Sequence, residues 1–262
     1  MNVGVFDSGL GGLTILKELA TTIKGANFFY LADTLNAPYG EKTPKQILQY
    51  SLNITQFFIL NHQIDALIIA CNTATSAAIE QIRLKYPNLI VIGTEPGIKP
   101  AIEMSQTGKI GVLATPATLK GVKYQELVNK LSNQNNVKLF EQPCPGLVEQ
   151  IEKAEIESKK TKEMLNYWLT PMRESGVDTI VLGCTHYPLI SKIIEQIMQR
   201  ELNLIHTGDA IAKRLLQLSR DIKHINKGII SITLYSTSKI NKNIVNNILN
   251  DKKVLPVALV KL

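Results

Sequence analysis

Short apolar runs alternate with helical patterns along much of the chain. Leu13, Leu16 and Leu19, for example, recur at the spacing of one helix face. Runs of four or five mostly apolar residues predict buried strands between such helices. These runs lie at residues 3–6, 28–31, 66–70, 89–92, 109–113 and 179–182.

Capping residues mark the start of one helix. Thr43 is followed by Pro44, and Thr is favoured as an N-cap while Pro fits the first helical position. We expect this helix to reach about Leu60. Another helical stretch follows the run at 66–70 directly and reaches about Tyr86, and the last two apolar runs are each followed by a helix.

This alternation predicts an α/β fold with mainly parallel sheets, because near-continuous apolar strands are covered by helices on both faces. No Gly-, Ser- or Pro-rich linker divides the chain. Residues 66–73 and 179–186 nevertheless echo one another, since each has an apolar strand, a small residue, a Cys and two polar residues. Two pseudo-symmetric α/β halves would produce this echo, although chance can produce it too.

Composition places the chain among ordinary globular proteins. It has 262 residues, of which 45% are hydrophobic and 19% charged, which fits one large domain or two small ones. The first ten residues contain no basic residue, and their apolar run is interrupted by Asp7 and Ser8. A signal peptide would have a basic segment followed by an unbroken apolar run. No stretch approaches the roughly 18 apolar residues of a membrane span. We therefore expect a cytoplasmic protein with no membrane partner.

The cysteines point to reduced thiols. Cys71, Cys144 and Cys184 are odd in number, widely spaced and free of any C-x-x-C pair, so they predict neither a disulfide framework nor a zinc site. Cys144 lies between Pro143 and Pro145 with no expected strand before it. We interpret it as a structural residue.

The net charge of +7 is concentrated in one segment. Residues 209–262 contain 10 Lys/Arg and 3 Asp/Glu, whereas residues 1–208 contain 19 of each. A nucleic-acid site would combine basic residues with stacking aromatics. This segment has scattered lysines and Tyr235 as its aromatic residue, so a solvated face is the favoured interpretation.

Reactive side chains follow three of the expected strands. Asp7-Ser8, Cys71-Asn72-Thr73 and Cys184-Thr185-His186 each lie at a strand's carboxyl end, where open parallel sheets bind ligands. We expect each segment also to begin a helix. A helix N-terminus binds carboxylates and lowers the pKa of a thiol from about 8.5, so these thiols are candidate proton acceptors.

A pair of thiols suits one kind of chemistry in particular. Inverting a stereocentre without a cofactor requires a base on one face of a planar carbanion and an acid on the other. The two groups exchange roles in the reverse direction. Two similar thiols from two pseudo-symmetric halves meet this requirement.

At several positions the sequence resembles the glutamate racemases of the aspartate/glutamate racemase group. The resemblance covers essentially the whole chain and is specific when its motifs are taken together. The motifs are Val5-Phe6-Asp7-Ser8-Gly9-Leu10-Gly11-Gly12, Pro38-Tyr39-Gly40, Ala70-Cys71-Asn72-Thr73-Ala74, Gly93-Thr94-Glu95-Pro96, Ala114-Thr115-Pro116-Ala117-Thr118 and Leu182-Gly183-Cys184-Thr185-His186-Tyr187-Pro188-Leu189.

The resemblance implies roles for individual residues. Cys71 matches the thiolate that takes the α-proton from D-glutamate, and Cys184 matches its counterpart for the L-enantiomer. Asp7 is similar to the carboxylate beside the first cysteine, while Glu149 and His186 match the groups that assist the second. The residues that match the family's substrate-binding positions are Asp7, Ser8, Tyr39, Gly40, Asn72, Thr73, Thr118, Thr185 and His186.

The resemblance also implies an architecture and a set of partners. The family has two α/β domains with the active site between them and the second inserted into the first. This predicts residues 1–95 plus 209–262 as one domain and 96–208 as the other. The substrate would be glutamate, the product D-glutamate for peptidoglycan synthesis, and the assembly a homodimer. The family needs no pyridoxal phosphate, metal or nucleotide.

One segment departs from the family pattern. The family more often has Gly before Asp33 and a basic residue near Asn36, whereas this chain has Ala32 and Asn36. The departure predicts an altered loop and one fewer cationic contact for a substrate carboxylate.

Three other functions remain open. The first is a dinucleotide-binding enzyme. Gly9-x-Gly11 and Asp33 resemble part of a dinucleotide fingerprint, but Thr14 occupies the third glycine position and Asp7 would repel a pyrophosphate.

The second alternative is a related racemase or isomerase that acts on aspartate, a hydantoin or maleate. A non-catalytic regulatory protein is the third alternative, because some glutamate racemases are thought to bind DNA gyrase. The sequence shows no recognition element for gyrase or nucleic acid, and it does not exclude either.

Overall fold

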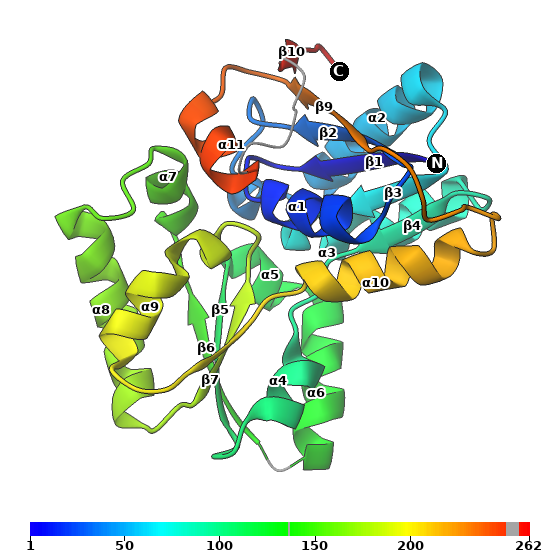
Figure 1. Cartoon of the computed structure of the whole chain (residues 1–262). Coiled ribbons are helices and arrows are strands. Elements are labelled where there is room, and N and C mark those ends of the chain that lie inside the picture. Colours follow the sequence, from blue (N-terminus) through cyan, green and yellow to red (C-terminus); the bar gives the residue numbers. More distant parts are fainter. Residues whose placement is uncertain (136, 250–256) are drawn as a thin grey trace. The chain divides into compact units, whose positions relative to one another are not determined.

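The computed structural model describes residues 1–135, 137–249 and 257–262. The chain divides into two units, Met1–Thr94 with Thr207–Leu262 and Glu95–His206. Each unit has its own sheet and its own helices (Figure 1). Within the described ranges, no helix combines the length and the apolar character needed to cross a membrane.

The first unit is built on a six-stranded sheet in the order β10-β9-β2-β1-β3-β4, and every neighbouring pair is parallel. β1 lies between β2 and β3, so their carboxyl ends meet at one edge of the sheet. The bounds are β1 Asn2–Asp7, β2 Asn27–Ala32, β3 Ala66–Ile69, β4 Ile90–Gly93, β9 Ser231–Ser236 and β10 Ala258–Leu259.

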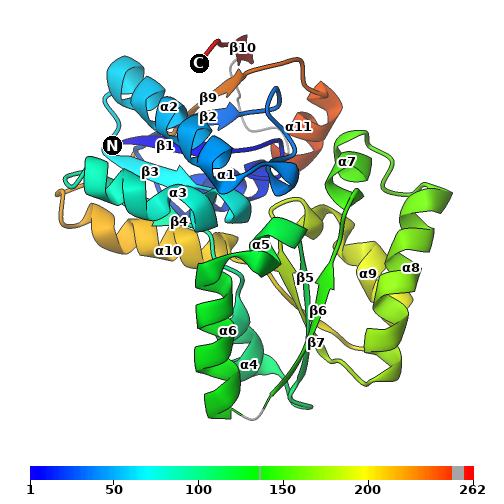
Figure 2. The same ribbon diagram turned by 180° about the vertical axis from the view of Figure 1, so that it is seen from behind.

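Helices pack on the first sheet in two groups, α2 beside α3 and α1 beside α10 and α11 (Figures 1 and 2). Phe6, Leu31 and Leu67 of the strands form one apolar cluster with Phe58 of α2 and Ile82 of α3. Alternate strand residues point to the opposite face, so the sheet is apolar on both sides. The bounds are α1 Leu13–Thr22, a 3-10 helix η1 Tyr39–Glu41, α2 Pro44–His62, α3 Asn72–Lys85, α10 Gly208–Ser219 and α11 Lys242–Leu249.

The second unit has a four-stranded parallel sheet in the order β6-β5-β7-β8. Leu113 and Leu182 pack in a cluster with α7, α8 and α9, whereas Val112 and Val181 pack in a cluster with α4, α5 and α6. The bounds are α4 Ile98–Met104, β5 Lys109–Ala114, α5 Pro116–Lys120, α6 Val122–Asn135, β6 Lys138–Pro143, α7 Leu147–Glu152, α8 Lys159–Glu174, β7 Thr179–Gly183, the 3-10 helix η2 Tyr187–Ile190, α9 Ser191–Met198 and β8 Asn203–Ile205.

The α/β class with parallel sheets is confirmed, and so are the six strands expected from apolar runs. The expectation that no strand precedes Cys144 is wrong, because β6 ends at Pro143. β6 is an edge strand with half-exposed positions, so it lacks the continuous apolar run of a buried strand. Its terminal Pro143 is tolerated because edge and end positions need no further ladder donor.

The expectation that each reactive segment begins a helix holds only for Cys71. α3 starts at Asn72, directly after that cysteine. A turn separates Asp7 from α1, whose N-cap is Gly12. The four-residue 3-10 helix η2 lies between Cys184 and α9.

Loss of the Thr43 side chain should loosen the start of α2. Its hydroxyl oxygen accepts a hydrogen bond from the Gln46 N–H at 3.3 Å, and the Gln46 side chain accepts one from the Thr43 N–H at 3.0 Å. Removing such a cap weakens a helix by about 1 kcal/mol. We predict that Thr43→Ala raises hydrogen exchange of the first-turn amides of α2 about fivefold, measured by mass spectrometry of the native protein.

The matched control is Thr170→Ala in α8, since Thr170 is half-buried inside a helix and caps nothing. It should leave exchange in α2 at the wild-type rate. Equal exchange rates in α2 for wild type and Thr43→Ala would show that the capping box contributes nothing to this helix.

Candidate functional site

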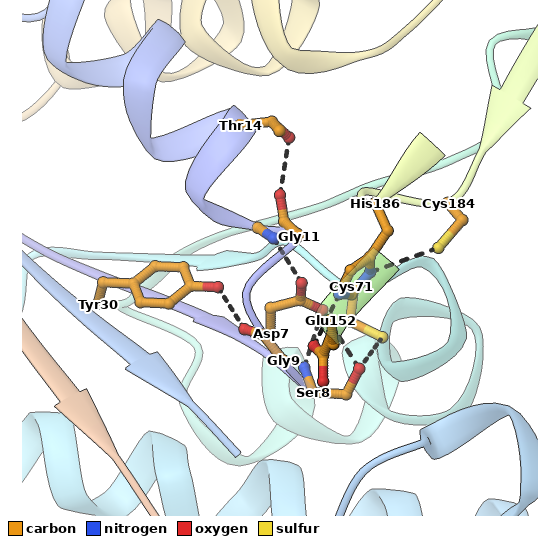
Figure 3. A network of polar contacts seen from close by, with 11 residues as sticks. Asp7, Ser8, Gly9, Gly11, Thr14, Tyr30, Cys71, Glu152, Cys184 and His186 are labelled. Atoms are coloured by element: carbon orange, nitrogen blue, oxygen red, sulfur yellow. Dashed lines mark hydrogen bonds and ion pairs between the residues drawn. The ribbon is translucent and has the colours of Figure 1, made fainter. Parts of the chain in front are cut away.

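A buried carboxylate organises the end of β1. Asp7 is fully buried and accepts hydrogen bonds from the N–H groups of Ser8 at 2.8 Å and Gly12 at 2.5 Å. The Tyr30 hydroxyl donates a hydrogen bond to the Gly9 carbonyl at 2.6 Å (Figure 3). This bond stabilises the turn between Ser8 and Gly12. The N–H groups of this turn therefore serve an internal carboxylate, which weighs against a pyrophosphate bound there.

Gly12 is required by space. A Cβ at this position would lie 2.7 Å from the Asp7 Cβ and 2.9 Å from the Ala70 Cβ. A methyl group would therefore push the turn away from the carboxylate that it surrounds. This explains the glycine at position 12.

Cys71 lies at the carboxyl end of β3 and is the N-cap of α3. Its sulfur accepts a hydrogen bond from the Ala74 N–H at 3.4 Å and contacts the Ser8 Oγ at 3.8 Å (Figure 3). The thiol is 6% exposed. Because a helix N-terminus favours negative charge, this position favours a thiolate at Cys71.

Asn72 has an unpartnered polar atom beside this thiol. Its amide oxygen is buried and accepts no hydrogen bond from any residue that the structure describes. A buried acceptor left unpaired destabilises a protein, so such an atom is typical of a site that receives its donor from a ligand. Thr73 is buried next to it in the first turn of α3.

The loop after β2 is organised by Asp33. Its buried carboxylate accepts hydrogen bonds from the Tyr39 hydroxyl at 2.5 Å, from the Thr237 hydroxyl at 2.8 Å and from the Asn36 amide at 3.0 and 3.1 Å. Burial, together with the neighbouring Asp33 carboxylate, raises the pKa of Tyr39 far above its usual value. Its hydroxyl therefore stays a donor to Asp33.

Cys184 lies at the carboxyl end of β7 in the second unit and is 8% exposed. Its sulfur is 3.7 Å from Nδ1 of the buried His186 (Figure 3). The thiol therefore has an imidazole as its polar neighbour, and the segment after it is the 3-10 helix η2 rather than an α-helix. Gly183, just before Cys184, approaches the β5 backbone closely, since a Cβ there would lie 2.9 Å from the Leu113 carbonyl oxygen.

The carboxylate partner of His186 is Glu152. Nε2 of His186 lies 2.8 Å from the Glu152 Oε1. Burial by itself lowers the pKa of His186, but the hydrogen bonds and negative charges of Cys184 and Glu152 outweigh it and raise that pKa well above its usual value. These neighbours therefore favour the protonated form of the imidazole beside the Cys184 sulfur.

Glu149, the residue expected to assist Cys184, lies one turn earlier on α7. Among the described residues, no hydrogen bond or ion pair involves its carboxylate, although its charge contributes to the raised pKa of Tyr187. Sequence reasoning missed Glu152, and the three-residue spacing from Glu149 on one helix was the only available signal.

The remaining predicted residues lie in the second unit. Thr118 is buried in α5 after β5, and its hydroxyl is 2.9 Å from that of Thr115. Thr185 is buried between Cys184 and His186. Cys144 is free and buried in the apolar core, and burial raises its pKa to about 12. A thiol with that pKa is not a proton acceptor at neutral pH, in agreement with a structural role.

The site residues thus form two sets, each at the carboxyl edge of one parallel sheet. Each set supplies one buried thiol with hydrogen-bonding or charged support, which suits proton transfer to and from carbon. Within the described part of the chain, no three His, Cys, Asp or Glu side chains gather as metal ligands.

Comparison with known proteins agrees with this chemistry. A family model described as Asp/Glu/Hydantoin racemase matches residues 11–215. A glutamate racemase from Sulfurovum sp. (strain NBC37-1) is 66% identical over 249 residues, which are 95% of this chain and 94% of that relative. A glutamate racemase from Aliarcobacter butzleri (strain RM4018) is 57% identical over 254 residues, or 97% of each chain.

The fold is also similar to that of solved structures. The structure of Escherichia coli glutamate racemase in complex with L-glutamate and the activator UDP-MurNAc-ala matches with a TM-score of 0.85 and 27% identity, over 100% of this chain and 99% of that one. Sequence, fold and the two thiol sites agree, and the chain belongs to the Asp/Glu/Hydantoin racemase family.

Proposed function

We propose that this protein is a glutamate racemase that interconverts L- and D-glutamate by two-thiol proton transfer without a cofactor. The observation that carries the proposal is the paired placement of Cys71 and Cys184. Each is a buried cysteine outside any disulfide, at the carboxyl end of an interior parallel strand, and each belongs to a different α/β unit.

The proposed chemistry moves one proton in each step. A thiolate takes the α-proton of glutamate, so the C–H bond breaks and its electron pair delocalises into the α-carboxylate. The opposite thiol then gives its proton to the other face of the planar carbon, and a new C–H bond forms. Cys184 starts the reaction with L-glutamate and Cys71 starts it with D-glutamate. After one turnover the protonation states of the two thiols have been exchanged.

The remaining predicted residues hold the substrate in this proposal. The buried Asn72 oxygen would accept from the substrate ammonium group, and the backbone N–H groups of Tyr39 and Gly40 would donate to a carboxylate. Hydroxyl groups would provide further hydrogen bonds from Ser8, Thr73, Thr118 and Thr185. Asp7 would act on the Cys71 side, and Glu149 and His186 on the Cys184 side.

Relatives favour glutamate over the other substrates of the group. Proteins 66% and 57% identical over nearly the whole chain are glutamate racemases by name, and the similar Escherichia coli structure holds L-glutamate. D-Glutamate is a building block of peptidoglycan, so the product would serve cell-wall synthesis in the cytoplasm.

The proposed assembly is a homodimer, as the family resemblance implies. We expect light scattering during size-exclusion chromatography to give twice the chain mass of 29.1 kDa. A monomer mass that is maintained at the concentrations of a racemisation assay would contradict the dimer but not the reaction.

The reaction itself is tested with the purified, chelator-treated protein. We expect L-glutamate in deuterated buffer with a reductant to lose its circular dichroism signal completely while deuterium replaces the α-proton, observed by NMR. Loss of the signal follows because the two enantiomers have equal free energy. If folded protein causes neither change with glutamate but does so with aspartate, the substrate assignment is wrong. No change with either substrate would contradict the proposed activity.

Replacing either thiol should slow turnover severely. We predict that Cys71→Ser and Cys184→Ser each lower kcat by about 10²- to 10⁴-fold, the usual contribution of one acid–base group. Each variant should keep α-proton exchange with one enantiomer, because exchange needs one base. Cys71→Ser would exchange L-glutamate, and Cys184→Ser would exchange D-glutamate.

Cys144→Ser is the matched control, since it removes a thiol that the mechanism does not use. It should racemise glutamate at close to the wild-type rate. Wild-type turnover in either of the other variants would rule out the two-thiol mechanism, and exchange of both enantiomers at equal rates by one variant would rule out one thiol for each face.

A further inference from the structure

The loop that follows β2 lies beside a segment from the C-terminal part of the chain. β9 pairs in parallel with β2, and Ala32 is opposite Ser236, so the two strands end at the same edge of the first sheet (Figure 1). The Thr237 N–H extends this pairing by donating a hydrogen bond to the Ala32 carbonyl at 3.1 Å. The chain therefore leaves β2 directly alongside the residues that follow β9.

The Thr237 side chain makes two hydrogen bonds to this loop. Its hydroxyl donates to the Asp33 Oδ1 at 2.8 Å and accepts from the Leu35 N–H at 3.0 Å. A hydroxyl has one proton to donate and lone pairs to accept with, so one side chain fixes both a carboxylate and a backbone amide. The Leu35 side chain is 69% exposed. Apolar packing therefore contributes little to holding this part of the loop, and the hydrogen bonds have to do so.

A second contact joins the same two segments. The Thr34 and Ser236 hydroxyls lie 2.9 Å apart, although 202 positions separate them in the sequence. Ser236 is fully buried, and its hydroxyl donates to the Ser238 carbonyl at 2.7 Å. Because that proton is used, Ser236 accepts the hydrogen bond and Thr34 donates it.

The hydrogen bonds continue from Thr237 to the far end of the loop. The Asp33 carboxylate that accepts from Thr237 also accepts from the Tyr39 hydroxyl and the Asn36 amide. Tyr39 and Gly40 are the residues of this loop that the proposed function places against the substrate. A loop already held in its bound conformation loses less conformational entropy when a ligand binds, and this improves affinity.

We propose that Thr237 is a positioning residue that holds the loop of residues 33–40 in its substrate-binding conformation and thereby sets the affinity for glutamate. The inference rests on the proposed function and deepens it by giving the C-terminal segment a part in substrate binding. In this role Thr237 acts through Asp33 and Leu35. Its chain of hydrogen bonds leads to residues that hold the substrate and includes neither thiol, so KM rather than kcat depends on it.

The test compares Thr237→Val with Thr233→Val. Both replace a hydroxyl by a methyl group at partly buried positions, but the Thr233 side chain forms no hydrogen bond with any residue that the structure describes. Thr237→Val should raise KM for both enantiomers about tenfold, because it removes a hydrogen bond to a charged group, and should leave kcat within about twofold. Thr233→Val should keep both constants at their wild-type values. Thr237→Ser retains the hydroxyl and should have a KM close to that of the wild type.

A further variant approaches the contact from the loop side. Thr34→Val removes the hydrogen bond to Ser236 and should raise KM about threefold, since both partners are neutral. It provides the test if circular dichroism shows that Thr237→Val is not folded. The proposal is overturned if the folded variants of both positions keep the wild-type KM, if kcat falls while KM is unchanged, or if Thr233→Val reproduces the effect.

Hydrogen exchange tests the loop without any substrate. In Thr237→Val the Leu35 amide loses its acceptor, so in the ligand-free protein it should exchange about tenfold faster, measured by NMR. Thr233→Val and Thr237→Ser should exchange this amide at the wild-type rate. An unchanged rate in Thr237→Val would overturn the inference even if the protein racemises glutamate. A wild-type protein that shows the expected exchange but does not racemise glutamate would instead refute the proposed function.

Discussion

The buried negative charge of Asp7 constrains the whole edge of the first sheet. A carboxylate without solvent is strongly destabilising unless donors surround it, and here the backbone of the following turn provides them. The turn can close around Asp7 only because Gly12 lacks a Cβ and because Tyr30 fastens Gly9. Parallel pairing of β1 with β3 then brings this turn beside Cys71. The hydrogen bonds around the Asp7 carboxylate thus determine which groups of this turn lie beside the Cys71 thiol.

The surroundings of Cys184 are built from different groups than those of Cys71. η2 follows Cys184, so no α-helix N-terminus is available directly after it, and the ionisable pair of His186 and Glu152 takes that place. In the proposed reaction the two sites need not be alike, because the equal free energies of the two enantiomers fix only the overall equilibrium constant and not the pKa of either thiol. Similar thiols can therefore be tuned by a helix N-terminus on one side and an imidazolium on the other.

What the sequence predicted correctly has a local cause. The parallel strands, the Thr43 cap and the strand-end positions of Cys71 and Cys184 depend on apolar runs and on residues within a few positions. β6 was missed because an edge strand is half exposed and has no continuous apolar run. Glu152 was missed because its contact with His186 joins residues 34 positions apart. No spacing in the sequence distinguishes Glu152 from Glu149, which lies on the same helix α7.

The loop after β2 differs from the expected family pattern at Asn36, and other residues of the fold compensate for this difference. The family resemblance leads us to expect a basic residue near Asn36, yet the Asp33 carboxylate accepts hydrogen bonds from neutral donors, among them the Asn36 amide and the Thr237 hydroxyl. A cation is therefore not needed to bury Asp33. The Tyr39 hydroxyl also donates to Asp33, so its proton is not available to an anion bound at this loop. In the proposed function, recognition of a substrate carboxylate at this loop would depend on the conformation that Asp33 maintains and not on the Tyr39 hydroxyl.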